Sequence, residues 1–256
     1  MTAPFDAVML SYDEPLADRL HARLQRILGT PVKRLHGVQG MRRAYRLAAE
    51  VVDAEQFLLA DGDFVLATEF ALSAVEPLDE GVSMRVWRAR NPLNGLIYGY
   101  GGLKLIRRSA LRDLGDAVDV LAALPGRTQF TAAIAGTTRI NQSPYHAWKA
   151  GFRECAMLAR GSEYGMDDTE AAERIAAWTA GGQGEFAEFA VSGAREGVAF
   201  AHEAARVPAR FDRLNDPGWL HARFTAAHGE RSSGRSNASA GCRRGRPSRT
   251  GCWSVG

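Results

Sequence analysis

Cysteine is scarce in this chain, with 3 residues in 256, and two of them, Cys242 and Cys252, lie near the C-terminus. Their spacing fits neither a zinc-binding motif nor a disulfide framework, so we expect a reducing compartment. No apolar stretch approaches the roughly 20 residues that a membrane-spanning helix needs. The first residues also lack the basic and apolar segments of a signal peptide. These absences predict a cytoplasmic protein with no membrane segment.

Several motifs of common enzymes are missing as well. The chain has no Gly-Lys-Ser/Thr phosphate loop and no Gly-x-Ser-x-Gly elbow. His202-Glu203 lacks the second histidine of a zinc-protease helix, and Gly99-Tyr100-Gly101-Gly102 lacks the spacing of a dinucleotide fingerprint. Kinase and hydrolase interpretations therefore have no support in the sequence.

Lysine is rare too, with 3 residues against 29 arginines. Six arginines lie in residues 231–256, which contain no acidic residue. Removing these six charges from the formal net charge of +3 leaves residues 1–230 at −3. The pI of 8.9 is therefore no evidence of a nucleic-acid-binding face on the folded part.

The chain does contain a regular alternation of apolar runs and amphipathic segments. Apolar runs at residues 5–12, 32–36 and 56–60 predict buried strands, and leucines spaced by four at residues 16–28 predict a helix. This alternation predicts an α/β fold with an open, mostly parallel sheet flanked by helices. Further segments are predicted as helices at 41–52, 113–124, 144–160, 169–179 and 194–206, and as strands at 82–88 and 103–106. We expect a core at 1–160, a helical extension at 161–230 and a disordered Arg/Gly/Ser tail at 231–256.

The motif that best predicts chemistry is Asp61-Gly62-Asp63, directly after an apolar strand. Two carboxylates at a strand end can face one hard cation such as Mg²⁺ or Mn²⁺. Ligands of open α/β sheets bind beyond the carboxyl ends of the strands, where Asp13 and Glu14 would also lie. The alternative is that Asp-Gly-Asp is only a polar turn.

Other basic and glycine-rich segments are candidates for binding phosphate. Arg90 and Lys104 flank a glycine-rich loop that contains Gly101 and Gly102. Lys149 and Arg153 lie one turn apart on a predicted helix and can bind a diphosphate or a polyanionic acceptor. His146 is a candidate third metal ligand, and His36-Gly37 ends the second predicted strand. Each of these features also has an interpretation without a binding role. The glycine-rich segment is then a loop of turn residues, Lys149 and Arg153 are a solvated basic pair, and each histidine is a surface residue.

These motifs, taken in order, resemble a group of small GT-A-fold glycosyltransferases from tailed bacteriophages and some bacteria. The resemblance rests on Asp61-Gly62-Asp63, on Arg90-Asn91-Pro92 with Gly101-Gly102-Leu103-Lys104, and on residues 147–155. It runs from Phe5 to about Leu158, and residues 215–220 are similar as well. Phe64 departs from the group, which often has asparagine there.

The resemblance implies a hexosyl- or pentosyltransferase that moves a sugar from a nucleotide sugar, usually a UDP-sugar, to an acceptor hydroxyl. Asp61 and Asp63 would bind Mn²⁺ or Mg²⁺, and Ser11, Tyr12 and Asp13 would receive the nucleoside. Some relatives are thought to modify hydroxymethylated pyrimidines in DNA, such as 5-hydroxymethylcytosine. If this chain is encoded by a phage, the resemblance implies that it acts in the host cytoplasm.

The catalytic base is left open between Glu14 and Glu154. A nucleotidyltransferase that uses the same carboxylate–metal–phosphate chemistry is the alternative enzyme. The alternative of another class is a nucleic-acid-binding accessory protein that acts through its basic tail.

Overall fold

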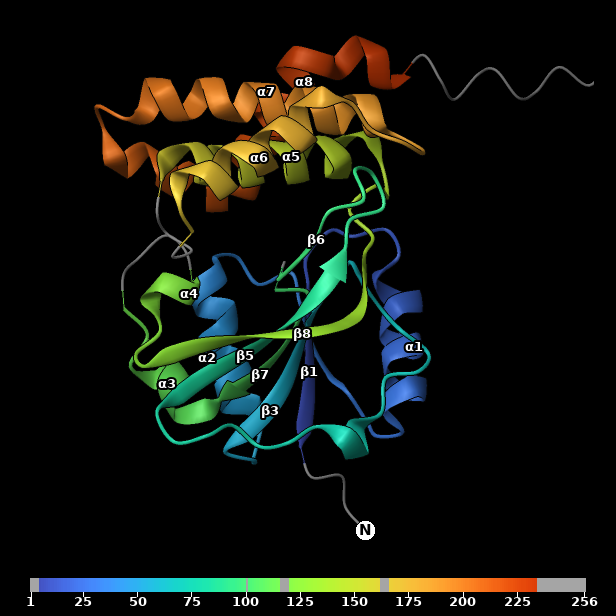
Figure 1. The fold of residues 1–256 in the computed structure, drawn as a ribbon. Coiled ribbons are helices and arrows are strands. Elements are labelled where there is room, and N and C mark those ends of the chain that lie inside the picture. Colours follow the sequence, from blue (N-terminus) through green and yellow to red (C-terminus); the bar gives the residue numbers. More distant parts are fainter. Residues whose placement is uncertain (1–4, 100, 116–119, 162–165, 234–256) are drawn as a thin grey trace, which may run out of the picture.

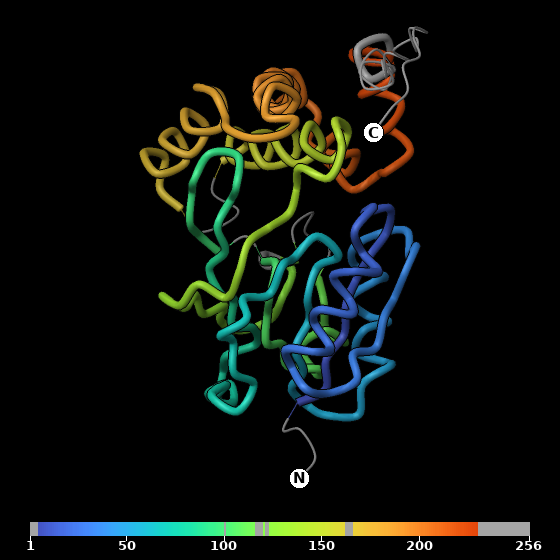
Figure 2. Tube along the Cα trace, turned by 90° about the vertical axis from the view of Figure 1, so that its right-hand side faces the viewer, coloured from blue at the N-terminus to red at the C-terminus, as the bar shows by residue number. Residues whose placement is uncertain are grey.

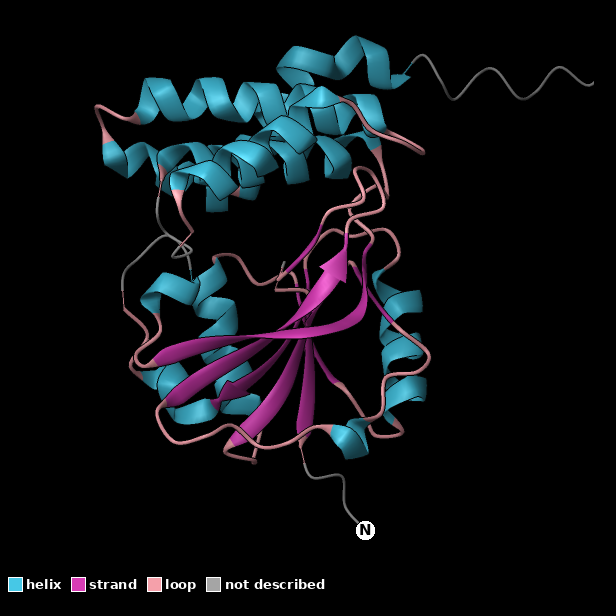
Figure 3. Cartoon of the chain, in the orientation of Figure 1, coloured by secondary structure: helices cyan, strands magenta, loops and turns pink. Residues whose placement is uncertain are grey.

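The computed structural model describes residues 5–99, 101–115, 120–161 and 166–233. It has a sheet with helices on both faces and a second layer of helices over one end (Figures 1 and 3). The strands are β1 (Asp6–Ser11), β2 (Lys33–His36), β3 (Gln56–Asp61), β4 (Phe64–Leu66), β5 (Val82–Arg90), β6 (Ile97–Tyr98), β7 (Leu103–Arg107) and β8 (Arg127–Thr138). The predicted α/β class is therefore confirmed.

The strand order is β2-β1-β3-β7-β5-β8-β4, with β6 paired to β5. Strands β1, β2, β3, β5 and β8 run in the same direction, whereas β4, β6 and β7 run opposite to them. The sheet is mixed because β7 lies antiparallel between β3 and β5. The carboxyl ends of the five codirectional strands share one edge.

Helices cover both faces of the sheet because each presents an apolar stripe. On one face α1 (Ala17–Leu28) buries Leu20, Leu24 and Leu28, and Gly29 ends it in the left-handed conformation. On the other face lie α2 (Met41–Val51), α3 (Arg108–Arg112) and α4 (Val120–Ala123), as Figure 1 shows. Within the helix expected at 113–124 the structure describes only the short helix α4, because α3 ends at Arg112 and residues 116–119 lie outside the described part.

The second layer lies over the edge where β5 ends (Figure 1). It contains α5 (Pro144–Arg160), α6 (Asp168–Ala180), α7 (Ala187–Ala204), α8 (Pro217–Ser233) and the 3₁₀ helix η2 (Pro208–Asn215); a shorter one, η1 (Leu72–Ala74), precedes β5. Ser143 caps α5 by accepting a hydrogen bond from the His146 N–H at 3.2 Å, and Pro144 follows at the first helical position. None of the described helices is long and apolar enough to cross a membrane.

This helical layer has its own hydrophobic core. Trp148 and Phe152 of α5 pack against α7, where glycines allow the two backbones to approach closely. A Cβ added to Gly193 would lie 2.1 Å from the Trp148 carbonyl oxygen, and one on Gly197 would lie 2.2 Å from that of Phe152. Because α5 belongs to this core, the expected boundary at residue 160 falls within the helical layer. The expected tail lies outside the described residues beyond Ser233, where α8 ends.

A loop from the sheet also enters the helical core. Leu93, which follows β5, is only 2% exposed and packs among residues of α5 to α8. The Gln183 N–H donates a hydrogen bond of 2.7 Å to its carbonyl oxygen. Figure 2 shows this segment rising from the sheet to the helices. The two layers are therefore joined by buried contacts.

Candidate active site

The ends of β1 and β2 meet beside a polar cavity at the edge of the sheet that lies under the helices. Ser11 and His36 pair in register, and the Ser11 Oγ lies 3.0 Å from the His36 Nδ1. The Gly37 N–H donates to the Ser11 carbonyl oxygen at 2.9 Å. A cavity of about 460 Å³ follows, lined by residues that include Tyr12, Asp13, Glu14, Arg34 and His36. The structure thus brings the predicted nucleoside-binding residues to one place.

Three carboxylates gather next to this cavity. The Glu14 Oε2 accepts the Tyr12 N–H at 2.7 Å, which turns the side chain back toward the end of β1. A Cβ added to Gly62 would lie 2.7 Å from that same Oε2 and 2.8 Å from the Ser11 Cβ. Only glycine between Asp61 and Asp63 therefore lets the Glu14 carboxylate lie against this turn.

The crowding of like charge is visible at Asp63. Burial, the Asp61 charge and the Glu14 charge, in that order, raise the pKa of Asp63 to about 7. Lys149 acts in the opposite direction but is outweighed. Binding of a proton or a cation would therefore stabilise the Asp63 side chain in this environment.

Lys104 neutralises Asp61 from inside the protein. Its side chain is 4% exposed, and its Nζ lies 2.7 Å from the Asp61 Oδ1 and 2.8 Å from the Tyr45 hydroxyl. Burial opposes the ammonium charge, but Asp61 and Tyr45 hold the pKa of Lys104 above its ordinary value. Phosphate binding by Lys104 stays a prediction; in the structure its ammonium contacts Asp61, whose own side chain is 38% exposed.

The two glycines before Lys104 serve packing. Gly101 has a φ of +76°, and a Cβ there would lie 3.1 Å from the Lys104 Cε. A Cβ on Gly102 would lie 2.4 Å from the Phe64 ring, while the Gly102 carbonyl oxygen accepts the Asp61 N–H at 3.0 Å. Packing therefore requires glycine at both positions, independently of the predicted contact with a ligand.

Asp13 links the sheet to the helical layer. The His146 Nε2 lies 3.2 Å from the Asp13 Oδ1, and the Lys149 Nζ lies 3.1 Å from the same oxygen. Burial raises the pKa of Asp13, but the His146 hydrogen bond and the Lys149 charge outweigh it and hold that pKa well below the usual range. The His146 Nδ1 also lies 2.7 Å from the Ser143 Oγ, so both ring nitrogens are occupied. The structure therefore pairs His146 with Asp13 rather than leaving it free to ligate a metal.

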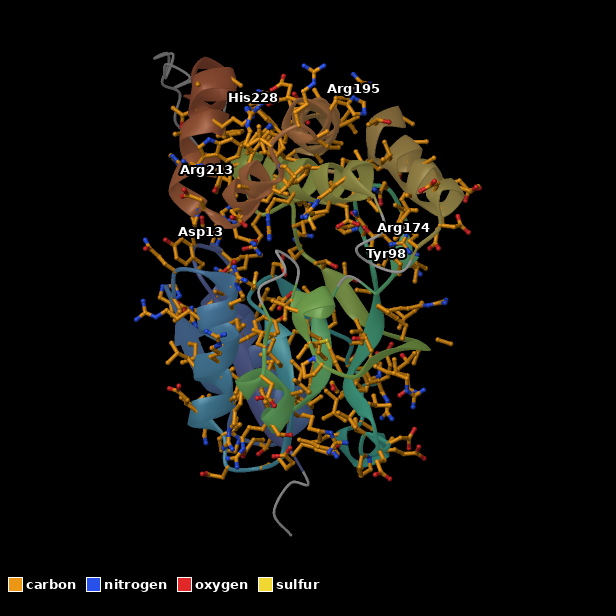
Figure 4. All side chains as sticks on the ribbon, turned by 90° about the vertical axis from the view of Figure 1, so that its left-hand side faces the viewer. Asp13, Tyr98, Arg174, Arg195, Arg213 and His228 are labelled. Atoms are coloured by element: carbon orange, nitrogen blue, oxygen red, sulfur yellow. The ribbon has the colours of Figure 1, made fainter. Side chains whose placement is uncertain are left out.

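Two more of the predicted residues, Arg153 and Glu154, lie along α5. The Arg153 guanidinium donates to the Asn215 Oδ1 at 2.9 Å. Glu154 accepts a hydrogen bond from the Tyr98 hydroxyl. Figure 4 labels Asp13 and Tyr98 at opposite sides of the molecule, below the helical layer. Of the two predicted catalytic carboxylates, Glu14 thus lies with Asp61 and Asp63, whereas Glu154 pairs with a residue on the other side.

One neighbour of Asp63 was missed by sequence reasoning. The Arg139 N–H donates to the Asp63 carbonyl oxygen at 2.7 Å, and its side chain is exposed. Arg139 directly follows β8, a strand that the apolar pattern did not predict because nine of its twelve positions are exposed or partly exposed. The threonines and isoleucine of residues 127–138 were the available signal.

Among the described residues, no three His, Cys, Asp or Glu side chains are arranged to hold a metal by themselves. Mg²⁺ and Mn²⁺ often take one or two carboxylates and complete their coordination with water and substrate phosphates. The partly exposed Asp61–Asp63 pair suits this second kind of site.

No family model matches the chain, and no curated protein matches it either. The solved structures that it matches at low similarity include the following two. HddC from Yersinia pseudotuberculosis is 12% identical over 52% of this chain and 91% of its own, with a TM-score of 0.38. The mannosyltransferase PcManGT from Pyrobaculum calidifontis, solved with GDP-Man and Mn²⁺, is 13% identical over 88% of this chain and 87% of its own, with a TM-score of 0.42. Likenesses this low assign no family, so the function is argued from the site.

Proposed function

We propose that this protein is a metal-dependent glycosyltransferase that moves a sugar from a nucleotide sugar to an acceptor hydroxyl. The observation that carries the proposal is the meeting of Glu14, Asp61 and Asp63 beside a polar cavity at the carboxyl edge of the sheet. Open α/β sheets bind ligands at this edge. A nucleoside in the cavity would place its diphosphate next to the carboxylates.

The residues present fit a divalent cation. The available donors are carboxylate oxygens, which Mg²⁺ and Mn²⁺ prefer. Lys104 fixes one oxygen of Asp61, and the exposed part of that side chain and Asp63 would hold the metal. When bound, the metal stabilises the negative charge that develops on the departing diphosphate.

The chain's own residues would perform three tasks. Ser11, Tyr12 and His36 would bind the nucleoside, since they line or adjoin the cavity. Lys149 would balance part of the diphosphate charge from the helical side.

The third task is proton removal, which we assign to Glu14 rather than Glu154. The acceptor oxygen attacks the anomeric carbon, and the bond from that carbon to the diphosphate oxygen breaks with its electron pair leaving on the diphosphate. The acceptor's proton passes to the Glu14 carboxylate.

Calorimetry with UDP, first with Mn²⁺ and then with chelator, tests the donor half. We expect binding that requires Mn²⁺, is lost in Asp63→Asn and is kept in Asp53→Asn, a control whose side chain is fully exposed on the surface. GDP is the next nucleotide. If neither UDP nor GDP binds with metal, the proposal is wrong.

Product analysis then defines the reaction. Incubation with a UDP-sugar and acceptors, starting with DNA that contains 5-hydroxymethylcytosine, should release UDP. Release of pyrophosphate from a nucleoside triphosphate and a sugar phosphate would instead identify a nucleotidyltransferase.

A further inference from the structure

Two arginines lie at the same end of the sheet as Asp63. Arg90 is the last residue of β5, and Arg139 follows the last residue of β8. Arg90 pairs with Thr137, which also pairs with Val65 of β4, and the Arg139 N–H bonds the Asp63 carbonyl oxygen. Strand β8 thus connects both arginines to the strand and turn that carry Asp63.

Both side chains are exposed, and among the described residues neither is joined to a carboxylate. Three other basic residues of the site already contact protein side chains. Lys104 is committed to Asp61, Lys149 to Asp13 and Arg153 to Asn215. The guanidinium groups of Arg90 and Arg139 are therefore available to an incoming anion.

We propose that Arg90 and Arg139 form a phosphate-binding pair beside the carboxylates. A guanidinium presents planar N–H groups that match phosphate oxygens, and it remains charged at every relevant pH. Arginines that were only solvated surface residues could lie anywhere on the protein, whereas these two lie at the sheet edge that also holds the cavity and the carboxylates. The proposal deepens the proposed function and rests on it for the source of the phosphate, which is either the donor diphosphate or a phosphate on the acceptor.

The test is calorimetric titration with pyrophosphate at low ionic strength in chelator. It compares wild type with Arg90→Gln and Arg139→Gln. Arg88→Gln is the matched control, because Arg88 is also exposed on β5 but pairs with Ile134, farther from the edge. Loss of one charge-assisted contact, worth about 1.5–3 kcal/mol, corresponds to roughly 10-fold to 100-fold weaker binding.

We expect this loss in Arg90→Gln and in Arg139→Gln, and less than a twofold change in Arg88→Gln. Thermal melts check that all three variants remain folded. The proposal is overturned if wild type does not bind pyrophosphate, if both variants bind as wild type does, or if Arg88→Gln loses as much as they do.

A second titration, with UDP and Mn²⁺, separates the two sources. If both variants also weaken UDP binding, the pair holds the donor diphosphate. If they leave UDP binding unchanged, it holds a phosphate on the acceptor; either result supports a phosphate site. Failure of the proposed function looks different, because wild type would then bind no UDP with Mn²⁺ while pyrophosphate binding still depended on the arginines.

Discussion

Replacing Asp63 with asparagine should stabilise the fold while abolishing the proposed metal binding. Burial and then the nearby charges of Asp61 and Glu14 raise the pKa of Asp63 to about 7 from an ordinary 3.8 in the folded protein. Above pH 7 the carboxylate is charged in both the folded and unfolded states, so the full cost of its burial and of this repulsion opposes folding. Asparagine has the same shape and no charge.

The magnitude follows from that pKa difference. A rise from 3.8 to about 7 corresponds to roughly 4 kcal/mol of destabilisation. Asp63 is partly exposed, and solvent screening reduces this figure, so we expect a gain of about 2 kcal/mol for Asp63→Asn at pH 8. In a chain of this length, a gain of that size raises Tm by roughly 4–8 °C.

Thermal melts in chelator at pH 8, 6 and 4 measure the effect. As the pH falls through 7 toward 3.8, folded wild type takes up a proton that the unfolded chain does not, so the advantage of Asp63→Asn should shrink. Asp61→Asn is the control of opposite sign, because it leaves the buried Lys104 ammonium without its ion pair, at a cost of about 2–4 kcal/mol. An Asp63→Asn variant less stable than wild type at pH 8, or a gain that persists at pH 4, would refute the reasoning.

Three further substitutions test other contacts. Gly62→Ala should push the Glu14 carboxylate away and lower sugar transfer about 100-fold, measured as UDP release. Gly193→Ala should cost at least about 2 kcal/mol in urea unfolding because its Cβ would meet a carbonyl oxygen of α5, whereas Gly229→Ala, with only ordinary contact, should be neutral or stabilising by up to about 1 kcal/mol. Asp13→Asn should lower Tm at pH 7; because the pKa of Asp13 is depressed, its contribution is present in full above about pH 4 and declines progressively as the pH falls below that, so the gap between the melts of variant and wild type should narrow steadily.

Local pattern was enough to predict the first half of the sheet. The apolar runs before Ser11 and Asp61 correspond to β1 and β3, which pair in parallel and bring the two acidic turns to one edge. Leucines spaced by four in α1 predicted its buried face. These features depend on residues close together in the chain, where apolar spacing is informative.

The second half depends on pairings that spacing does not reveal. Strand β8 is irregular against β5, with register shifts near Val86 and Arg88, so its burial pattern does not alternate. The partner of Lys104 follows from the antiparallel placement of β7 beside β3. Helix α7 begins at Ala187, earlier than the 194 expected, because small residues pack it against α5.

The burial of Leu93 in the helical core affects how the chain folds during its synthesis. It leaves the ribosome with the sheet, but its partners in the helical core reach to α8, roughly 130 residues later, which takes about 6–26 s of synthesis. During that time an apolar loop of the sheet has nothing to cover it. A fragment that ends after Thr138 would stay in that condition permanently, so the nascent chain and any such truncation should both depend on chaperones until the helices arrive.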